Sequence, residues 1–421
     1  MSEILLRNIV VDGKEVDLLI QGERIAKIAE HIEPGDETES LNCYGMTAVP
    51  SFVNMHVHAG MAMFKGVGED RAFHEWLDRI WRIEKNIDDE YVYVATKLSG
   101  VEMIKSGTTT FNDHYWRSPM AYQAANEMGM RATLSVVICD NFNEEKSSMQ
   151  REEVEDVYNQ SLSWCDRVKF AVGLHSVYSV MEKNLVWGTE FARRHGLKIH
   201  IHLCETEKEV RDCKAAHGGL TPVEYLNELG MLGPDLICAH TLWLGEHDIE
   251  LLGANHVNCV HNINSNLKLA SGYKFLYNEL RDAGANICLG TDGCGSSNNM
   301  DMLETMKTSA MLQKAWRHDP TAMPLEELFN AATINGARAL GIDSGVLREG
   351  ALADINVVQT NNYAFLSPGS FLSNYIYSAH SNTIKHSICN GEFVMKDRRV
   401  RNQPHIEEEA RVCLRKALKN K

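Results

Sequence analysis

The sequence lacks any pair of cysteines separated by two residues, although it contains 11 cysteines. An odd, scattered set of this kind is typical of reduced thiols and argues against a disulfide framework. The chain also has no apolar run long enough to cross a bilayer. Its first residues, MSEILLRNIVVDG, lack the charged-then-apolar pattern of a signal peptide. We therefore expect a cytoplasmic protein with no membrane partner.

Basic clusters are equally scarce. The formal net charge is −15, and the longest basic stretch is the short KDRRVR at residues 396–401. Nucleic acids and anionic membrane surfaces are bound by clustered Lys and Arg. The sequence therefore predicts no nucleic-acid partner, and KDRRVR is best interpreted as a solvated surface turn.

Short, strongly apolar runs recur along the middle of the chain, and longer segments with helical periodicity separate them. Near-continuous apolar strands that alternate with helices are typical of a parallel sheet covered by helices. The runs cover residues 47–58, 108–115, 131–139, 168–177, 197–205, 236–243, 256–264 and 285–293. Eight such units predict an α/β fold, a (β/α)₈ TIM barrel.

The two ends of the chain have a different texture, with short strand-like runs and turn signals such as Asn390-Gly391. We predict that residues 1–49 and 350–421 together form one small β-sandwich domain. The catalytic barrel would then occupy residues 50–349. The segment EEEARVCLRKALK near the C-terminus has the pattern of an amphipathic helix.

The first predicted barrel strand ends in VNMHVHAGM, which places His56 and His58 one residue apart. Because side chains alternate along a strand, both rings face the same side. If that side is the barrel interior, two neutral imidazoles could share a divalent cation. A hydrogen-bonded pair of core histidines is an equally good interpretation of this motif alone.

Other polar residues fall at the ends of later strands, where barrel enzymes carry their active sites. They are His175 after the fourth strand, His202 and Glu205 after the fifth, His240 after the sixth and Asp292 after the eighth. Singly, each could be a satisfied core or turn residue. Together they indicate a site, with His200 as a deeper hydrogen-bonded residue. Cys204, Cys238, Cys259, Cys288 and Cys294 lie near the same strands, and we interpret them as small buried hydrophobes.

Several stretches carry a resemblance to a known family: PSFVNMHVHAGM, FHEWLDRIWRIE, HIHLCETEKEV, CAHT, HNINSNLKLASG and LGTDGCGSSNNMDM. At these positions the sequence resembles the amidohydrolase superfamily, in particular its methylthioadenosine/S-adenosylhomocysteine deaminase and chlorohydrolase branch. The resemblance covers essentially the whole chain. It implies one divalent metal ion, expected to be zinc, with iron in some relatives, held by His56, His58, His202 and Asp292.

The resemblance also implies roles for residues around the metal. His240 and Asp292 match residues that orient the catalytic water, and Glu205 matches the residue that moves protons. On the substrate side, Glu84 matches a residue that holds ribose hydroxyls, and His175 matches a substrate-binding histidine. For Glu84, a solvated position near a helix end is the alternative.

Two further substrate contacts are less well defined by the sequence. Trp76 would line the pocket or pack in the core of an amphipathic helix. Val136 stands where relatives that bind S-adenosylhomocysteine carry an arginine for its carboxylate, and Arg151 loosely matches a second such arginine. The loss of one arginine favours adenosine, 5′-deoxyadenosine or methylthioadenosine over S-adenosylhomocysteine.

We therefore predict a hydrolase, a cyclic-amidine deaminase, whose small-molecule substrate is an adenine nucleoside. Deamination or dehalogenation of another heteroaromatic ring, such as a guanine-like, pterin or triazine ring, is the alternative on the same scaffold. A third hypothesis is a catalytically silent barrel that serves as a binding module. The sequence leaves open whether the protein forms a homo-oligomer.

Overall fold

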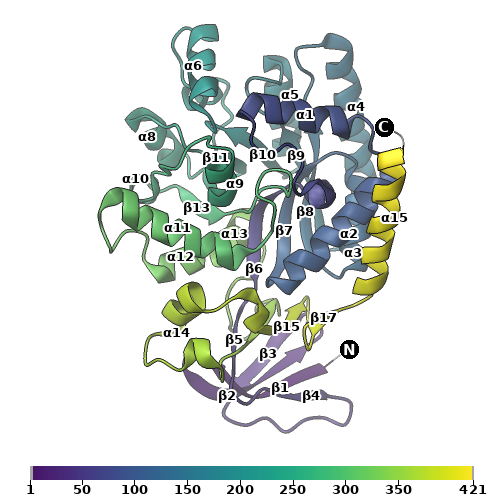
Figure 1. Ribbon diagram of the computed structural model, residues 1–421, viewed down its shortest axis with the longest axis vertical. Helices are drawn as coiled ribbons and strands as arrows, with labels where there is room; N and C mark the ends of the chain where they lie inside the picture. Colours follow the sequence, from purple (N-terminus) through teal and green to yellow (C-terminus); the bar gives the residue numbers. More distant parts are fainter. Residues whose placement is uncertain (1–2, 420–421) are drawn as a thin grey trace.

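The computed structural model describes residues 3–419, and its centre is an eight-stranded parallel sheet curled into a barrel (Figure 1). The strands follow one another around the barrel in chain order, from β6 to β13. Their bounds are β6 Phe52–Val57, β7 Thr108–Tyr115, β8 Arg131–Ile138, β9 Val168–Leu174, β10 Lys198–Leu203, β11 Leu236–His240, β12 Asn258–His261 and β13 Asn286–Leu289. Each of the eight predicted apolar runs contains one of these strands, which confirms the TIM-barrel prediction.

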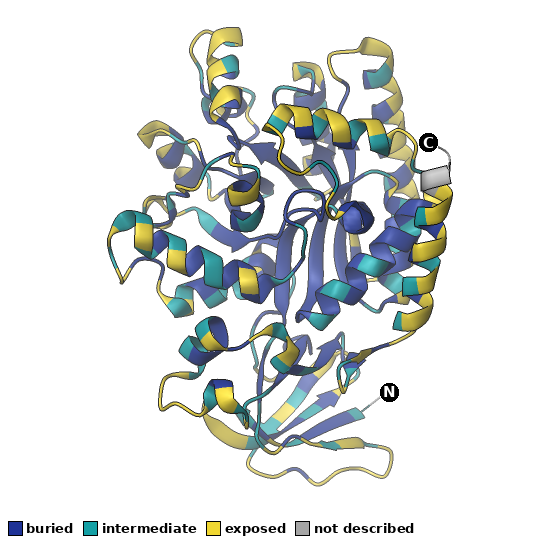
Figure 2. Ribbon diagram, viewed as in Figure 1, coloured by how far each residue is buried: buried dark blue, intermediate teal, exposed yellow. Residues whose placement is uncertain are grey.

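The barrel strands are buried on both faces, and their polar residues are buried together with the apolar ones. Every residue of β7 and of β8 is buried, and Figure 2 shows the barrel strands as a continuous buried centre. The barrel closes where the end of β13 approaches β6. There the backbone N–H of Asp292 donates to the carbonyl of His56 at 2.9 Å. Gly290 permits this approach, since a Cβ at that position would lie 2.9 Å from Cβ of His56.

Helices surround the barrel and connect its strands (Figure 1). They are α1 Phe73–Glu84, α2 Asp89–Lys105, α3 Ser118–Glu127, α4 Glu144–Ser161, α5 Glu182–Arg194, α6 Glu207–Ala216, α7 Pro222–Glu228, α8 Glu246–Ala254, α9 Ile263–Lys268, α10 Tyr277–Ala283, α11 Met302–Arg317, α12 Leu325–Ala331 and α13 Ile334–Leu340. Helix α1 differs from most of the others because it lies across the end of the barrel where the strands finish.

Strands from both ends of the chain form a second, mostly antiparallel sheet below the barrel (Figure 1). They are β1 Glu3–Val11, β2 Lys14–Gln21, β3 Arg24–Ala29, β4 Glu39–Asn42, β5 Met46–Pro50, β14 Ile355–Gln359, β15 Ile384–Cys389, β16 Glu392–Lys396 and β17 Arg399–Val400. β5 and β14 pair directly, so the sequence correctly joins the two termini in one unit. The first predicted run divides at Ser51: β5 belongs to this sheet, and β6 begins the barrel.

The last helix, α15 Gln403–Lys419, leaves the small sheet and packs along α2 of the barrel (Figure 1). Lys97 on α2 donates to Glu409 on α15 at 2.9 Å. A polar link also joins the two units at the base of the barrel, where buried Arg131 on β8 pairs with buried Asp354 at 3.1 Å. The predicted boundaries at residues 49 and 350 stay predictions.

All eleven cysteines are free thiols, and ten of them are buried, with Cys165 partly exposed. Burial of Cys204, Cys238, Cys259, Cys288 and Cys294 agrees with their interpretation as small hydrophobes. Among the helices that lie within residues 3–419, none combines the length and the apolar character needed to cross a membrane.

Candidate metal centre and active site

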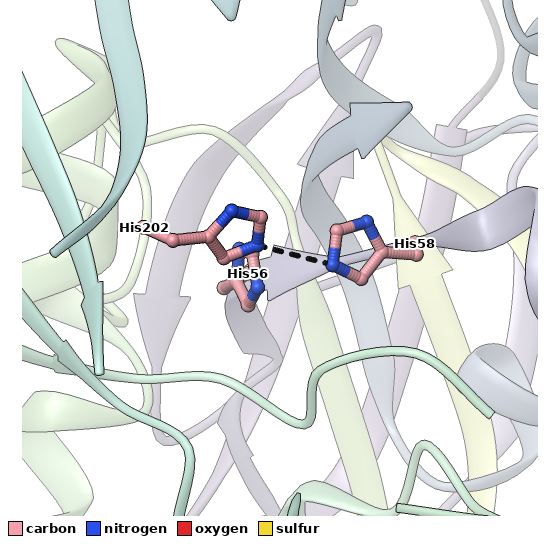
Figure 3. Close-up of side chains that lie close together, drawn as sticks. All are labelled: His56, His58 and His202. Carbon is pink, nitrogen blue, oxygen red and sulfur yellow. Dashed lines mark hydrogen bonds between the residues drawn. The ribbon is translucent and has the colours of Figure 1, made fainter. Parts of the chain in front are cut away.

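Three histidines and one aspartate converge at the end of the barrel where the strands finish. His56 lies on β6, His58 follows it, and His202 lies on β10 across the barrel. The Nε2 atoms of His58 and His202 are 3.3 Å apart, and Figure 3 shows the two rings facing each other with His56 beside them. Asp292, which follows β13, places Oδ1 3.4 Å from Nε2 of His56 and 3.2 Å from Nε2 of His58.

Backbone carbonyls orient two of these rings for metal binding. Nδ1 of His58 lies 2.6 Å from the carbonyl of His114, and Nδ1 of His202 lies 2.8 Å from the carbonyl of His175. A carbonyl only accepts, so each Nδ1 carries the proton and each Nε2 lone pair points to the centre. The third ring, His56, contacts Nε2 of buried His200 through Nδ1 at 2.9 Å. His200 is thus the deeper hydrogen-bonded residue that the sequence suggested.

The charges at this centre are strongly coupled. Burial favours neutral carboxyl groups, but the neighbouring His56 and His58 hold the pKa of Asp292 well below its usual range. Burial likewise lowers the pKa of His202 far below that of a free imidazole, and the other histidines add to this effect. The site therefore presents a carboxylate together with neutral imidazole at position 202, as a metal ligand requires.

The residues fit a divalent metal ion. Their donor atoms form two overlapping groups, His56–His58–His202 and His56–His240–Asp292, and within each group all the atoms lie within 4.8 Å of one another. Nε2 of His56 is buried and has no hydrogen-bond partner among the described residues, as expected of an atom reserved for a ligand. Imidazole nitrogens with a carboxylate oxygen form a donor set typical of catalytic zinc sites.

Two further polar side chains border this centre. Glu205 follows β10 and His240 ends β11, and Nε2 of His240 lies 3.7 Å from Oε2 of Glu205. Burial, with the charges of Asp292 and Glu209, raises the pKa of Glu205 well above its usual value. The side chain of Asn266 donates to Nδ1 of His240 at 2.9 Å. The proton of the neutral His240 ring is therefore on Nε2, which faces Glu205 and the metal ligands.

The backbone around these residues adopts conformations that L-amino acids rarely use. Cys204, His240, Thr241 and Asp292 have φ angles of 52°, 77°, 45° and 63°. Left-handed backbone is uncommon outside glycine and especially so for a β-branched threonine. Such residues concentrate at functional sites, because the surrounding structure has to hold them in place. Here they turn the chain sharply at the ends of β10, β11 and β13.

Helix α1 forms the outer wall of the site. Trp76 and Glu84 on this helix, with His175 after β9, line a cavity of about 50 Å³, which is also lined by His58, His202, Asp292 and Glu205. The indole N–H of Trp76 donates to the carbonyl of Gly295 at 3.0 Å, which fixes its ring at the cavity wall. A wider cavity of about 370 Å³ adjoins the first and shares Trp81, Glu84 and Trp116 with it.

Arg151 is the predicted site residue that the structure places elsewhere. It lies two turns into α4, where it donates to Asn184 and stacks over the ring of Trp187, both on α5. Arg151 lines neither of the two cavities at the site. Lys146, one turn nearer the start of α4, lines the wider cavity instead. The loop between β8 and α4 sets which basic residue reaches the site, and strand periodicity does not define that loop.

Sequence reasoning also missed the side chains at the end of β7. His114, Tyr115 and Trp116 follow one another there, and His114 and Trp116 line the inner cavity. The hydroxyl of Tyr115 donates to Oε1 of Glu84 at 2.7 Å. The signal was present in the run TTTFNDHYW, which ends the second strand with polar and aromatic residues, just as His56 and His58 end the first.

The fold and this site define a metal-dependent hydrolase of the TIM-barrel type, and comparison with known proteins agrees. The model of the amidohydrolase family matches residues 47–394. The chain therefore belongs to the amidohydrolase family.

Curated relatives resemble the chain over nearly its whole length. The 5′-deoxyadenosine deaminase of Methanothermobacter thermautotrophicus is 37% identical over 401 residues, which cover 93% of each chain. The 5-methylthioadenosine/S-adenosylhomocysteine deaminase of Thermococcus sibiricus is 38% identical over 403 residues, or 94% of each chain. Among solved structures, an adenosine deaminase from Xanthomonas campestris with bound zinc superimposes with a TM-score of 0.92 at 27% identity, covering 99% of this chain and 98% of that one.

Proposed function

We propose that the protein is a metal-dependent deaminase that releases ammonia from the amino-bearing ring of an adenine nucleoside. The observation that carries this proposal is the joint position of Glu205 and His240 beside the His56–His58–His202–Asp292 centre. A site of this kind combines metal ligands with a separate acid–base residue, as hydrolytic attack on an aromatic ring requires. Relatives that are named deaminases of adenine nucleosides support the same reaction.

His56, His58, His202 and Asp292 would hold a single ion, with zinc as the proposed metal and iron as the alternative. The fourth strand, β9, ends at Leu174 and His175 follows it, so no lysine stands there to bridge a second ion. A bound divalent ion supplies Lewis acidity that makes water a nucleophile at neutral pH.

The chain's own residues would guide the protons. Glu205 would take a proton from the attacking water and deliver it to the ring nitrogen, and burial raises its pKa above the usual value, which favours its role as a proton carrier. His240 donates from Nε2 and would orient the attacking oxygen, because Asn266 fixes its tautomer. Asp292 would accept a proton and pass it to the leaving ammonia. All three side chains line the inner cavity, and residues of α1 form its outer wall.

The ribose of the substrate would bind on the side of the site away from the metal ligands. Glu84 borders both cavities and is placed to accept hydrogen bonds from ribose hydroxyls, while Trp76 and His175 line the inner cavity. Lys146 is the basic residue in the outer cavity, and it donates to the carbonyl of Cys139. With Val136 buried on β8 and Arg151 turned toward α5, a small 5′ group suits this site better than a charged amino acid. We therefore favour adenosine, 5′-deoxyadenosine and methylthioadenosine over S-adenosylhomocysteine.

A deamination screen tests the proposal. Purified, zinc-loaded protein is incubated with adenosine, 5′-deoxyadenosine, methylthioadenosine, S-adenosylhomocysteine, guanine and a pterin, and released ammonia is measured. We expect turnover of the adenine nucleosides and much less of the free base and the pterin. Turnover of guanine or the pterin alone would favour the alternative, a deaminase of another heteroaromatic ring. Absence of ammonia with every compound would contradict the proposal.

A further inference from the structure

Tyr115 contacts the one acidic residue of α1 that faces both cavities. It ends β7, its side chain is 1% exposed, and its hydroxyl donates to Oε1 of Glu84 at 2.7 Å. The other carboxyl oxygen, Oε2 of Glu84, is buried and has no hydrogen-bond partner among the residues that the structure describes. A buried acceptor without a partner costs free energy and marks a place where a ligand can donate.

The ring of Tyr115 packs tightly against the turn that contains Gly60. Gly60 lies against it so closely that a Cβ there would be 2.0 Å from Cε1 of the ring. The turn that contains Gly60 is itself anchored, since Asp113 accepts from the N–H of Ala59 at 2.8 Å and Ser99 donates to the carbonyl of Ala59 at 2.7 Å. The phenol therefore has one available position, and its hydroxyl defines the position of the Glu84 carboxyl.

Glu84 needs such support because burial works against its charge. Burial raises the pKa of Glu84 to about 7, and the hydrogen bond from Tyr115 opposes that shift and favours the carboxylate. The carboxylate accepts hydrogen bonds from neutral donors more strongly than the protonated acid does. Tyr115 thus occupies one oxygen, stabilises the charge, and leaves the second oxygen for the ligand.

We propose that Tyr115 is a positioning residue that makes this site selective for ribosylated rings. Its hydroxyl fixes Glu84 so that Oε2 accepts from a ribose hydroxyl of the substrate. This inference rests on the proposed function, because it assigns the ribose of an adenine nucleoside to the space beside Glu84. Tyr115 itself lines neither of the two cavities.

The test compares two substrates on two proteins. Tyr115→Phe removes only the hydroxyl and keeps the ring against Gly60. With adenosine, the variant should show a KM about tenfold higher, since a hydrogen bond to a charged group is lost, and a kcat within about twofold of the parent. With 2′,3′-dideoxyadenosine, which has no hydroxyls at these positions, KM should not change. An equal loss with both substrates, or no loss with either, would overturn the proposal.

A matched control and a double variant distinguish a positioning role of Tyr115 from a general loss of stability or activity. Tyr225→Phe removes a comparable hydrogen bond, which Tyr225 donates to Glu182 at 3.0 Å. Because Tyr225 lines neither cavity, this variant should leave the KM of both substrates unchanged. If Tyr115 acts through Glu84, adding Tyr115→Phe to Glu84→Gln should cost little beyond Glu84→Gln alone. Additive losses would contradict the proposal.

Calorimetric titration tests the role of Tyr115 in binding separately from the proposed deamination. The parent protein should bind adenosine about tenfold or more tightly than 2′,3′-dideoxyadenosine, and Tyr115→Phe should reduce that ratio. Binding without ammonia release would refute the proposed reaction and still decide the role of Tyr115. Equal affinity of the parent for both nucleosides would overturn the role of Tyr115 even if deamination proceeds.

Discussion

Replacing Glu205 with glutamine is the sharpest perturbation of the proposed chemistry. The side chain is 6% exposed, and Nε2 of His240 lies 3.7 Å from its Oε2, beyond hydrogen-bond distance. Glutamine has the same shape but neither accepts nor releases a proton at neutral pH. The substitution therefore removes the acid–base function and leaves the packing almost unchanged.

The expected loss of rate follows from what general acid–base catalysis contributes to the reaction. Loss of a positioned acid–base residue lowers rates by about 10²–10⁴-fold, which raises the activation barrier by roughly 3–5 kcal/mol. Because Glu205 is not a metal ligand, metal content should stay equal to that of the parent. Its carboxyl is not part of a hydrogen bond that holds the fold, so the free energy of unfolding should change by less than about 1 kcal/mol.

The assay measures ammonia release from adenosine under saturating conditions, with metal content by elemental analysis and thermal unfolding on the same preparations. Glu207→Gln, two residues on and exposed at the start of α6, is the matched control and should retain full activity. A Glu205→Gln variant that deaminates within about tenfold of the parent rate would refute the assignment of Glu205 as the proton carrier.

Two other predictions concern the metal and the ribose. The His56→Ala variant should lose most of its bound metal and all measurable activity, because His56 supplies a ligand atom to both donor groups. Full metal occupancy of this variant by elemental analysis would show that the ligand set is wrong. The KM for adenosine should rise as pH falls through about 7, because burial raises the pKa of Glu84 to about 7 and protonation weakens it as an acceptor. Glu84→Ala should abolish this pH dependence and raise the KM at pH 8; a parent-like pH profile in that variant would contradict the role of Glu84.

The sequence defined the barrel well because its strands are buried on both faces. Runs such as RATLSVVIC and VKFAVGLHSV are buried along almost their whole length and rich in apolar residues, so each one is recognisable by itself. The metal residues were recognisable for a related reason. Polar groups at the end of an otherwise apolar strand are costly unless they bind something, and seven such residues fall at the ends of five strands of the predicted barrel.

Other features could not be derived because they depend on loops and on packing between distant segments. The sequence predicted Arg151 as a substrate contact. In the structure, the loop before α4 places Lys146 at the wider cavity, and Arg151 contacts α5 instead. The position of α1 across the barrel, and with it the contact between Tyr115 and Glu84, is set by packing over the site. The docking of α15 on α2 likewise joins residues about 300 positions apart, for example Lys97 and Glu409.

Removal and restoration of the metal ion show whether deamination by this protein depends on a bound metal. The purified protein is stripped with a chelator, assayed for ammonia release from adenosine and 5′-deoxyadenosine, and then titrated with zinc. We expect the stripped protein to be inactive and its activity to return in proportion to added zinc, reaching a plateau at about one ion per chain. Full activity in the metal-free protein, or no deamination of any adenine nucleoside after reconstitution, would contradict the account.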